Sequence, residues 1–368
     1  MIIKNNSSIQ HLFLALSIIF FSNCDSNIKH REFSSLIIKD VVKDSTLNVR
    51  AIDFNDEYLF YGSQDHFAKI NLNEQVRIDL DKFEISQEGD NQKFTIEKED
   101  GSFMHFRAVE IAGENIFTMS IENPARIYKL HRKSTTPRLV YEENHPKAFY
   151  DAMAFWNENE GLAIGDPTED CMSILITRDS GENWQKLSCD LLPKTEDGEA
   201  AFAASDTNIA IVGDHTWIAT SGKKSRVLYS SDKGKSWEIF NTPIIQGKPT
   251  TGLYSIDFYD QNHGFGIGGD YTSPEDNKKN KVITNNGGKT WKVVAENKAP
   301  GYRSCVQYIP NSEAKALVAV GFEGISYSKD AGENWIQLSD ESFYTLKFIN
   351  ESEAFAAGKG RISKLIFY

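Results

Sequence analysis

Four copies of one eight-residue pattern, called here the box motif, constrain the fold of this chain more than any other feature. The copies begin at residues 177, 230, 284 and 328, so they recur at intervals of 44 to 54 residues. Each copy reads hydroxyl, any residue, Asp or Asn, any residue, Gly, any residue, small polar residue, Trp. The defining positions are Asp179, Gly181 and Trp184; Asp232, Gly234 and Trp237; Asn286, Gly288 and Trp291; and Asp330, Gly332 and Trp335. Such regular recurrence is typical of a repeat architecture.

The residue types of the box motif predict a turn between two antiparallel strands. An Asp or Asn side chain can accept backbone N–H groups of its own loop, and Gly allows a backbone conformation that a Cβ atom resists. The Trp then begins the next strand and needs apolar cover. Asn286 occupies the Asp position of the third copy, and an amide suits hydrogen bonding better than acid–base chemistry. We therefore interpret the motif as structural and assign it no catalytic role.

A second pattern precedes the box motifs. An aromatic residue is followed six residues later by a small residue and ten residues later by Gly. The three clear copies are Phe155, Gly161 and Gly165; Phe258, Gly264 and Gly268; and Phe348, Ala354 and Gly358. Strand, turn, small-residue strand, third strand, box motif and fourth strand make one unit of a β-propeller. The sequence thus predicts an all-β propeller with seven four-stranded antiparallel blades, with six or eight blades as the alternatives.

The last predicted unit ends after its third strand, at Tyr368. The segment 33–39 near the N-terminus can supply the missing fourth strand. Pairing of the two chain ends would close the ring and remove an exposed sheet edge. Residues 33–368 are therefore expected to form a single propeller domain.

The N-terminus has the features of an export signal. Lys4 precedes an apolar run over 12–21 that is too short to span a membrane, and Cys24 follows soon after it. We expect a lipoprotein-type signal over 1–23, lipidation of Cys24 and a tether over 24–32. The alternative is an ordinary secretory signal with an incidental cysteine. Both predict a protein outside the cytoplasm, and the first predicts membrane contact through a lipid anchor in the bacterial cell envelope.

Cys171 and Cys189 flank the first box motif. If the motif lies at the end of a hairpin, these cysteines stand nearly opposite one another, and an oxidising compartment would allow a disulfide. Two unpaired thiols are the alternative. The cysteines lack the spacing of a metal site, and we expect neither a metal nor a cofactor.

Net charge and glycine spacing argue against two further functions. The formal net charge of −12 does not favour a nucleic-acid partner. Residues 264–269 fit the G-x-G-x-x-G pattern of dinucleotide-binding proteins, but no helix pattern follows them. We interpret these glycines as sites of close packing within a strand.

Together the two patterns over residues 45–368 resemble the BNR/Asp-box propellers related to photosystem II stability and assembly factors. The resemblance is strongest over 149–360. It implies a seven-bladed propeller that acts as a binding or assembly scaffold. We expect a monomer with a protein or glycan partner in the cell envelope. Those relatives present a basic surface, whereas this chain is acidic, so the photosystem role itself is not expected.

Candidate ligand-binding residues lie where the first strand of each unit begins and the second ends, because these points share one face of a propeller, opposite the box motifs. The candidates on this top face are Arg50, Arg107, Asp151, Asp166, Asp214, Tyr254, Asp270, Arg303 and Tyr344. Convergent Arg, Tyr and carboxylate groups can bind a polar ligand or a peptide terminus. Salt bridges between neighbouring blades are the alternative interpretation.

Sialidases also carry box motifs of this kind, so a glycan-processing hydrolase is the alternative function. The chain lacks the Arg-Ile-Pro segment of sialidases. Asp166 and Asp270 could still form a two-carboxylate pair of the type that glycosidases use.

Overall fold

The computed structural model describes residues 32–73 and 91–368. Residues Glu32–Tyr368 form one compact unit. The predicted signal, Cys24 and all of the tether up to residue 31 lie outside the described residues. Within the described ranges there is no helix long and apolar enough to cross a membrane.

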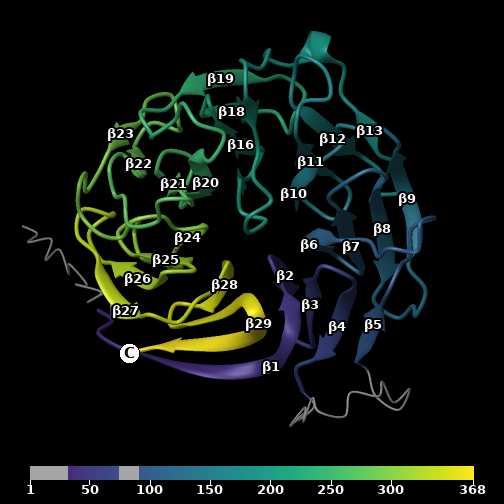
Figure 1. The fold of residues 1–368 in the computed structure, drawn as a ribbon, viewed down its shortest axis with the longest axis horizontal. Coiled ribbons are helices and arrows are strands. Elements are labelled where there is room, and N and C mark those ends of the chain that lie inside the picture. The colour runs from purple at the N-terminus through teal and green to yellow at the C-terminus, as the bar shows by residue number, and fades with distance from the viewer. Residues whose placement is uncertain (1–31, 74–90) are drawn as a thin grey trace, which may run out of the picture. The chain divides into compact units, whose positions relative to one another are not determined.

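Seven antiparallel sheets surround a common axis, which confirms the predicted seven-bladed propeller (Figure 1). The first three blades comprise β2 (Ala51–Phe54), β3 (Tyr58–Gly62), β4 (Phe67–Asn71) and β5 (Gln92–Phe94); β6 (Phe106–Ala112), β7 (Asn115–Ser120), β8 (Ala125–His131) and β9 (Arg138–Glu143); and β10 (Tyr150–Phe155), β11 (Gly161–Gly165), β12 (Ser173–Thr177) and β13 (Gln185–Lys186). The next three comprise β15 (Ile209–Val212), β16 (His215–Ala219), β18 (Arg226–Ser230) and β19 (Glu238–Asn241); β20 (Thr251–Phe258), β21 (Gly264–Asp270), β22 (Lys281–Thr284) and β23 (Lys292–Val293); and β24 (Cys305–Tyr308), β25 (Leu317–Gly321), β26 (Gly324–Ser328) and β27 (Ile336–Ser339).

The two ends of the described chain complete the seventh blade. It consists of β28 (Thr345–Asn350), β29 (Glu353–Phe367) and β1 (Leu36–Asn48). Strand β29 folds back on itself, since the backbone N–H of Phe367 donates to the carbonyl of Ser352 at 2.8 Å (Figure 1). Its two arms supply the second and third strands, and β1 pairs with the second arm as the fourth. The predicted closure is confirmed, although the closing strand begins at Leu36 rather than at residue 33.

The fourth blade departs from the repeat and sends a loop into the centre of the ring. Short strands β14 (Glu199–Ala200) and β17 (Ser221–Gly222) pair with each other, and β17 also pairs with β20 of the fifth blade. Residues 201–208 between β14 and β15 then cross the axis; we call this segment the plug. It is the teal loop below the label β16 in Figure 1. The first strand of this blade therefore begins at Ile209, about ten residues later than the repeat pattern indicates.

Plug residues bond to the inner strands of several blades. The Asp206 carboxylate accepts the N–H groups of Val109 and Met153, at 3.0 and 3.1 Å, and so joins the second and third blades. Ser205 donates to the carbonyl of Ser304 at 2.6 Å and accepts a bond at its own carbonyl from Thr345, at 2.8 Å. The plug thus links several blades through hydrogen bonds to their inner strands and occupies the centre of the ring between them.

The box motifs lie between the third and fourth strands of blades three to six, as predicted. In the first copy Asp179 Oδ1 accepts the Thr177 hydroxyl at 3.0 Å and the Asn183 N–H at 2.9 Å, and Oδ2 accepts the Asn183 side-chain amide at 2.7 Å. Gly181 has φ +71°, a value that favours glycine. Every acceptor of this carboxylate is engaged within its own turn, which supports the structural interpretation.

The aromatic–glycine pattern marks residues that face each other across the first and second strands. Phe155 pairs with Gly161, and Phe258 with Gly264. A Cβ atom on Gly264 would stand 2.5 Å from the Phe258 ring, so the ring needs glycine opposite it. The box tryptophan packs on the same ring: Trp184 stands perpendicular to Phe155, with centroids 5.7 Å apart. The two sequence patterns are therefore two sides of one packing unit.

Cys171 and Cys189 form a disulfide in the structure, with their Cα atoms 5.4 Å apart. Cys171 lies just before β12 and pairs with Lys194 through an isolated bridge. Cys189 begins a short 3-10 turn, η2 (Cys189–Leu191), after the last strand of the blade. The disulfide ties the outer edge of the third blade to the segment that leads into the fourth.

Candidate functional site

A cavity of about 410 Å³ lies at the end of the axis where the first strands begin, and we call it the mouth. Inner strands bring residues from most blades to it, and the plug forms its floor. The lining residues are Arg50, Arg107, Phe149, Asp166, Ala200, Ala201, Phe202, Ala203, Ala204, Tyr254, Tyr271, Tyr302, Ser304, Phe322 and Tyr344. A concave site with an apolar wall and a few convergent charged groups is the usual form of a ligand site.

Two arginines from neighbouring blades give the mouth its charge. Arg50 precedes β2 and donates to the plug carbonyl of Ala204 at 3.1 Å; Arg107 in β6 donates to the carbonyl of Ala203 at 2.8 Å. Arg50 also stacks over the Tyr344 ring at 4.0 Å. Burial and the nearby Arg50 lower the pKa of Arg107 to about 10, so both groups stay charged at neutral pH. Neither guanidinium has an ion pair with a carboxylate in the described part of the chain.

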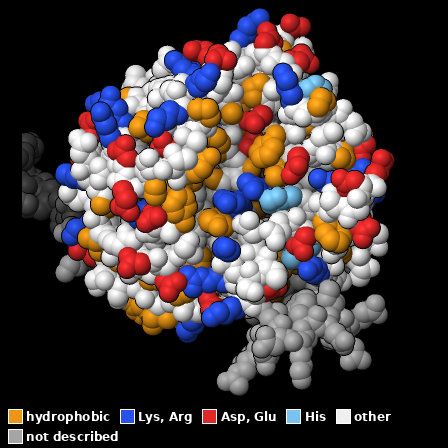
Figure 2. Space-filling model, viewed as in Figure 1, with side chains coloured by type: hydrophobic (Ala, Val, Ile, Leu, Met, Phe, Trp, Pro, Cys, Tyr) orange, Lys and Arg blue, Asp and Glu red, His pale blue; other side chains and the backbone are white. Residues whose placement is uncertain are grey.

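Aromatic side chains form the opposite wall of the mouth. Phe202 of the plug stacks on Tyr254 at 4.3 Å, Tyr254 stands perpendicular to Tyr302 at 4.8 Å, and Tyr302 stacks on Phe322 at 5.0 Å. Figure 2 shows one face of the propeller, on which Lys, Arg and His side chains lie beside a band of hydrophobic side chains around the centre. The mouth therefore joins a cationic side to an aromatic side.

Two carboxyl groups of the third blade lie behind the arginines. Asp166, after β11, lines the mouth and accepts the plug N–H of Ala201 at 2.8 Å. Burial raises the pKa of Asp166 to about 6. Asp151 in β10 is fully buried, and neither of its oxygens has a hydrogen-bond partner among the described residues. Burial and the neighbouring Asp166 raise the pKa of Asp151 well above its usual range, which favours its protonated form.

The structure brings five of the nine predicted top-face residues together: Arg50, Arg107, Asp166, Tyr254 and Tyr344 line the mouth. The other four do not line it. Asp151 is buried beside the mouth. Arg303 points away from it and donates to the Ser326 hydroxyl and to Gln337. Ser304, the next residue, lines the mouth in its place. Asp270 accepts the Thr272 N–H and Lys248.

The placement of Asp214 on the top face is wrong. Asp214 lies between β15 and β16, in the turn that joins a first strand to a second, and it pairs with Lys233 at 3.7 Å. This turn is on the box-motif side. The error arises from the plug, which delays the first strand of the fourth blade and places Gly213 before the second strand rather than at its end.

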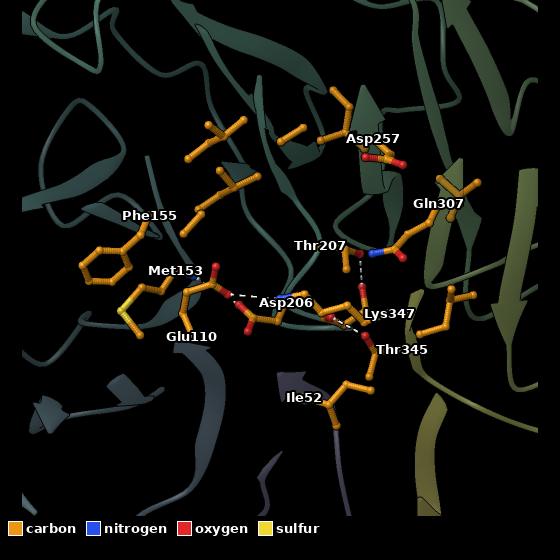
Figure 3. A pocket seen from close by; sticks show the side chains of 18 of the residues that line it. Ile52, Glu110, Met153, Phe155, Asp206, Thr207, Asp257, Gln307, Thr345 and Lys347 are labelled. Atoms are coloured by element: carbon orange, nitrogen blue, oxygen red, sulfur yellow. Dashed lines mark hydrogen bonds and ion pairs between the residues drawn. The ribbon is translucent and has the colours of Figure 1, made fainter. Parts of the chain in front are cut away.

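A second cavity, of about 450 Å³, lies on the other side of the plug and was not predicted. Figure 3 shows Glu110, Asp206, Asp257 and Lys347 around it. Polar side chains one residue before the anchor aromatic bond to the next blade: Asp257 accepts the Tyr308 N–H at 2.7 Å, and Gln307 accepts the Phe348 N–H at 3.2 Å. These groups link the inner strands. The sequence signal for them is the repeated Asp-Phe pair at 53–54 and 257–258.

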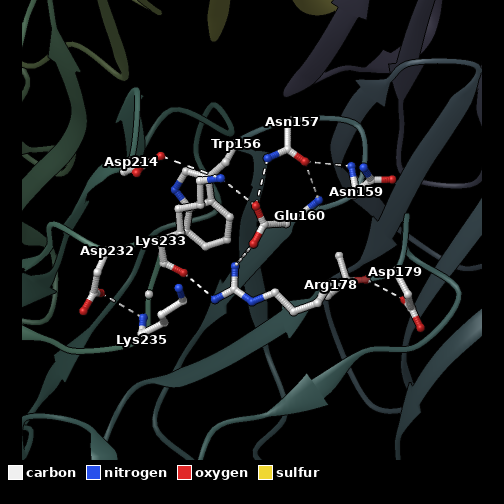
Figure 4. Close-up of polar contacts among 12 residues, drawn as sticks. Trp156, Asn157, Asn159, Glu160, Arg178, Asp179, Asp214, Asp232, Lys233 and Lys235 are labelled. Atoms are coloured by element: carbon white, nitrogen blue, oxygen red, sulfur yellow. Dashed lines mark hydrogen bonds and ion pairs between the residues drawn. The ribbon is translucent and has the colours of Figure 1, made fainter.

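On the box-motif side, polar contacts join the third and fourth blades (Figure 4). Glu160 accepts Lys233 Nζ at 2.6 Å, Arg178 Nη1 at 3.0 Å and the Asn157 side-chain amide at 2.9 Å. The hydrogen bond from Lys233, together with the Asn157 hydrogen bond and the charge of Arg178, lowers the pKa of Glu160 to about 2. Arg178 also lies 5.0 Å from the Trp156 ring. These charged side chains form ion pairs with one another, whereas Arg50 and Arg107 in the mouth have no carboxylate partner among the described residues.

The described ranges contain no group of three or more His, Cys, Asp or Glu residues placed to hold a metal ion. The fold and the mouth define the chain as a seven-bladed β-propeller with a ligand-sized cavity at its axis. No protein-family model matches the chain, and no curated protein matches it in sequence.

Solved structures similar to this chain include three propellers. A structure described as YCF48 bound to D1 peptide has a TM-score of 0.62 and 13% identity over 92% of this chain and 96% of that one. YCF48 from Cyanidioschyzon merolae has a TM-score of 0.61 and 12% identity over 90% and 98%. The RRP9 WD40 repeats have a TM-score of 0.60 and 10% identity over 92% and 100%. At these identities the likeness establishes the fold alone.

Proposed function

We propose that this propeller is a non-catalytic scaffold that binds a protein partner through the mouth. The observation that carries the proposal is the pair Arg50 and Arg107, two half-buried guanidinium groups that have no carboxylate partner among the described residues and lie beside an aromatic wall. An arginine pair binds carboxylates through charge-assisted hydrogen bonds. An extended peptide segment that offers a carboxylate beside an apolar side chain would match both sides of the mouth. The similar structure described as YCF48 bound to D1 peptide supports a peptide ligand by analogy.

We also propose that the protein is exported and anchored by a lipid on Cys24, as a member of the BNR/Asp-box propellers. The four box motifs support the family, and the signal-like sequence over 1–23 supports export. The Cys171–Cys189 disulfide supports an oxidising compartment.

A glycan-processing hydrolase has weaker support. A glycosidase of the common type needs two carboxyl groups that flank one bond. Asp166 is the single carboxylate among the described residues that line the mouth, and Asp270 is not one of them.

An array of twelve-residue peptides, each synthesised with a free carboxylate and as the amide, tests the proposed function. The wild-type protein should bind some of the peptides in which a carboxylate lies near an apolar residue. This carboxylate can be the free terminus or an internal acidic side chain. Arg50→Gln with Arg107→Gln should lose this binding, whereas Arg138→Gln on the exposed outer edge should keep it. Equal binding by the double variant and the wild type would show that the mouth is not the site.

A further inference from the structure

We propose that Asp166 makes ligand binding at the mouth pH-sensitive, with stronger binding of carboxylate ligands in mild acid. This inference rests on the proposed function and concerns the regulation of the same site. The cationic mouth has one carboxyl group, Asp166, in its lining and a second, Asp151, buried behind the first.

The two carboxyl groups have different environments, so they have different roles. Asp151 has no exposed surface, and neither of its oxygens has a hydrogen-bond partner among the described residues. Burial of a carboxylate without such a partner is costly. Burial therefore favours the protonated form of Asp151. Asp166 reaches the mouth and accepts the Ala201 N–H, which favours its ionised form. Asp166 is thus the member of the pair that can gain or lose a proton in response to the solvent.

Neighbouring elements also bring His105, Arg107, Lys186 and Glu122 to this part of the ring. From β6 and the residue before it come Arg107 and His105; the Arg107 side chain donates to His105 at 3.1 Å. Burial and Arg107 lower the pKa of His105 to about 4, so this ring is neutral above pH 5. Lys186 of β13 turns away to Glu143 and Thr168, and Glu122 is exposed at the rim.

Protonation of Asp166 changes the charge that a ligand meets. Above pH 6 the lining carries two guanidinium charges and one carboxylate, whereas below pH 6 the carboxylate is neutral. A ligand carboxylate gains attraction when the like charge beside it is removed. If the bound ligand shifts the pKa of Asp166 by one unit, its affinity changes about tenfold across the transition.

Titration of the complete chain with N-acetyl-L-tryptophan at pH 5.0, 6.0 and 7.5, followed by NMR, tests the inference, with N-acetyl-L-tryptophan amide as the uncharged counterpart. The wild-type protein should bind the carboxylate about tenfold more tightly at pH 5.0 than at pH 7.5, with a midpoint near pH 6. Asp166→Asn should bind it tightly at every pH. Asp214→Asn, the same change on the box-motif side, should keep the wild-type dependence.

The outcomes separate the two claims. Binding that is independent of pH in the wild type, or equally pH-dependent in Asp166→Asn, overturns the role of Asp166 and leaves the mouth as a carboxylate site. Failure of the wild type to bind the carboxylate more tightly than the amide at any pH overturns the proposed site and the inference with it. A parallel change in affinity for the uncharged amide would also contradict the inference, because the amide lacks the charge that Asp166 opposes.

Discussion

Lys347 of the seventh blade donates to Asp53 of the first blade, with Nζ 2.5 Å from Oδ1. The other oxygen of Asp53 accepts the N–H of Ile111 in the second blade at 2.7 Å, so one carboxylate joins three blades at the point where the ring closes. Lys347 also lies 3.6 Å from Glu110. These contacts reinforce the closure that β1 provides at the outer edge.

Replacement of Lys347 by Met should lower the free energy of unfolding by about 1–3 kcal/mol, because Asp53 and Glu110 would lose their shared cation. Urea denaturation at pH 7 measures this. Lys364→Met is the matched control, since Lys364 pairs with Glu353 within one blade at the surface, and it should cost less than about 1 kcal/mol. Equal losses in the two variants would contradict a special role for the Lys347 contact.

Asp206→Asn should loosen the second and third blades at the axis. The two oxygens of Asp206 accept two N–H groups, whereas Asn has one oxygen and would turn its amide toward the other N–H. The expected loss is about 1–3 kcal/mol. Asp206 has φ +59°, a conformation that Asn tolerates, so the effect would not come from backbone strain. Hydrogen exchange should accelerate at Val109 or Met153, and unchanged exchange at both would refute the role of the plug.

The sequence predicted the blades but not the plug, and the reason lies in the fourth blade. Phe155 and Phe258 identify their blades in the sequence because each requires a glycine on the facing strand and packs against the tryptophan of a box motif. In the fourth blade the first strand ends at Val212 instead of an aromatic residue. The repeat pattern therefore could not locate the first strand of this blade. The conformation of residues 201–208 depends on partners on other blades that are far away in the sequence. No local pattern records such contacts.

The candidate site was predictable in part for the same reason. Arg50, Tyr254 and Tyr344 each lie four residues before the anchor phenylalanine of a first strand, and Arg107 lies at the equivalent position of β6. One repeat position maps to one place on the ring. Tyr302, Phe322 and Phe202 come from loops outside that register, so of the aromatic wall only Tyr254 could be predicted from the repeats.

The pH dependence of stability should reveal the acid in the second cavity. Burial and the nearby Asp53 raise the pKa of Glu110 to about 7, against attraction from Lys347. A carboxyl group whose folded pKa is raised contributes stability below its unfolded pKa and loses it as pH rises through the folded pKa. The wild type should therefore lose stability relative to Glu110→Gln between pH 4.5 and 7, by on the order of 1–3 kcal/mol.

Urea denaturation of both proteins at pH 5.0 and 7.5 measures this difference. The two proteins must be compared because both contain His105, whose pKa burial lowers to about 4. Between about pH 4 and the pKa of His105 in the unfolded chain, this histidine makes stability rise with pH, opposite to the effect of Glu110. Parallel curves for the two proteins would mean that Glu110 does not titrate in this range.

Asn286→Asp should preserve the third box motif. Asn286 Oδ1 accepts the Thr284 hydroxyl and the Thr290 N–H, both at 3.0 Å, and a carboxylate can accept the same bonds. The Thr290 hydroxyl would then donate, as the Ser236 hydroxyl does to Asp232. The melting temperature should change little, whereas Asn286→Ala should cost about 1–3 kcal/mol because two donors lose their acceptor. A large loss in Asn286→Asp would contradict the equivalence of the four copies.

Cys171→Ser with Cys189→Ser should lower the free energy of unfolding of the oxidised protein by about 2–4 kcal/mol. The bridge closes a loop with a sequence separation of 18, and a loop of about this length restricts the unfolded chain by that amount. Reductant should destabilise the wild type to the level of the double variant and leave the variant unchanged. Cys305→Ala controls for thiol effects, because this buried cysteine is outside the bridge. If reductant did not alter wild-type unfolding, the disulfide would not contribute to stability, and the support that it gives to export would be lost.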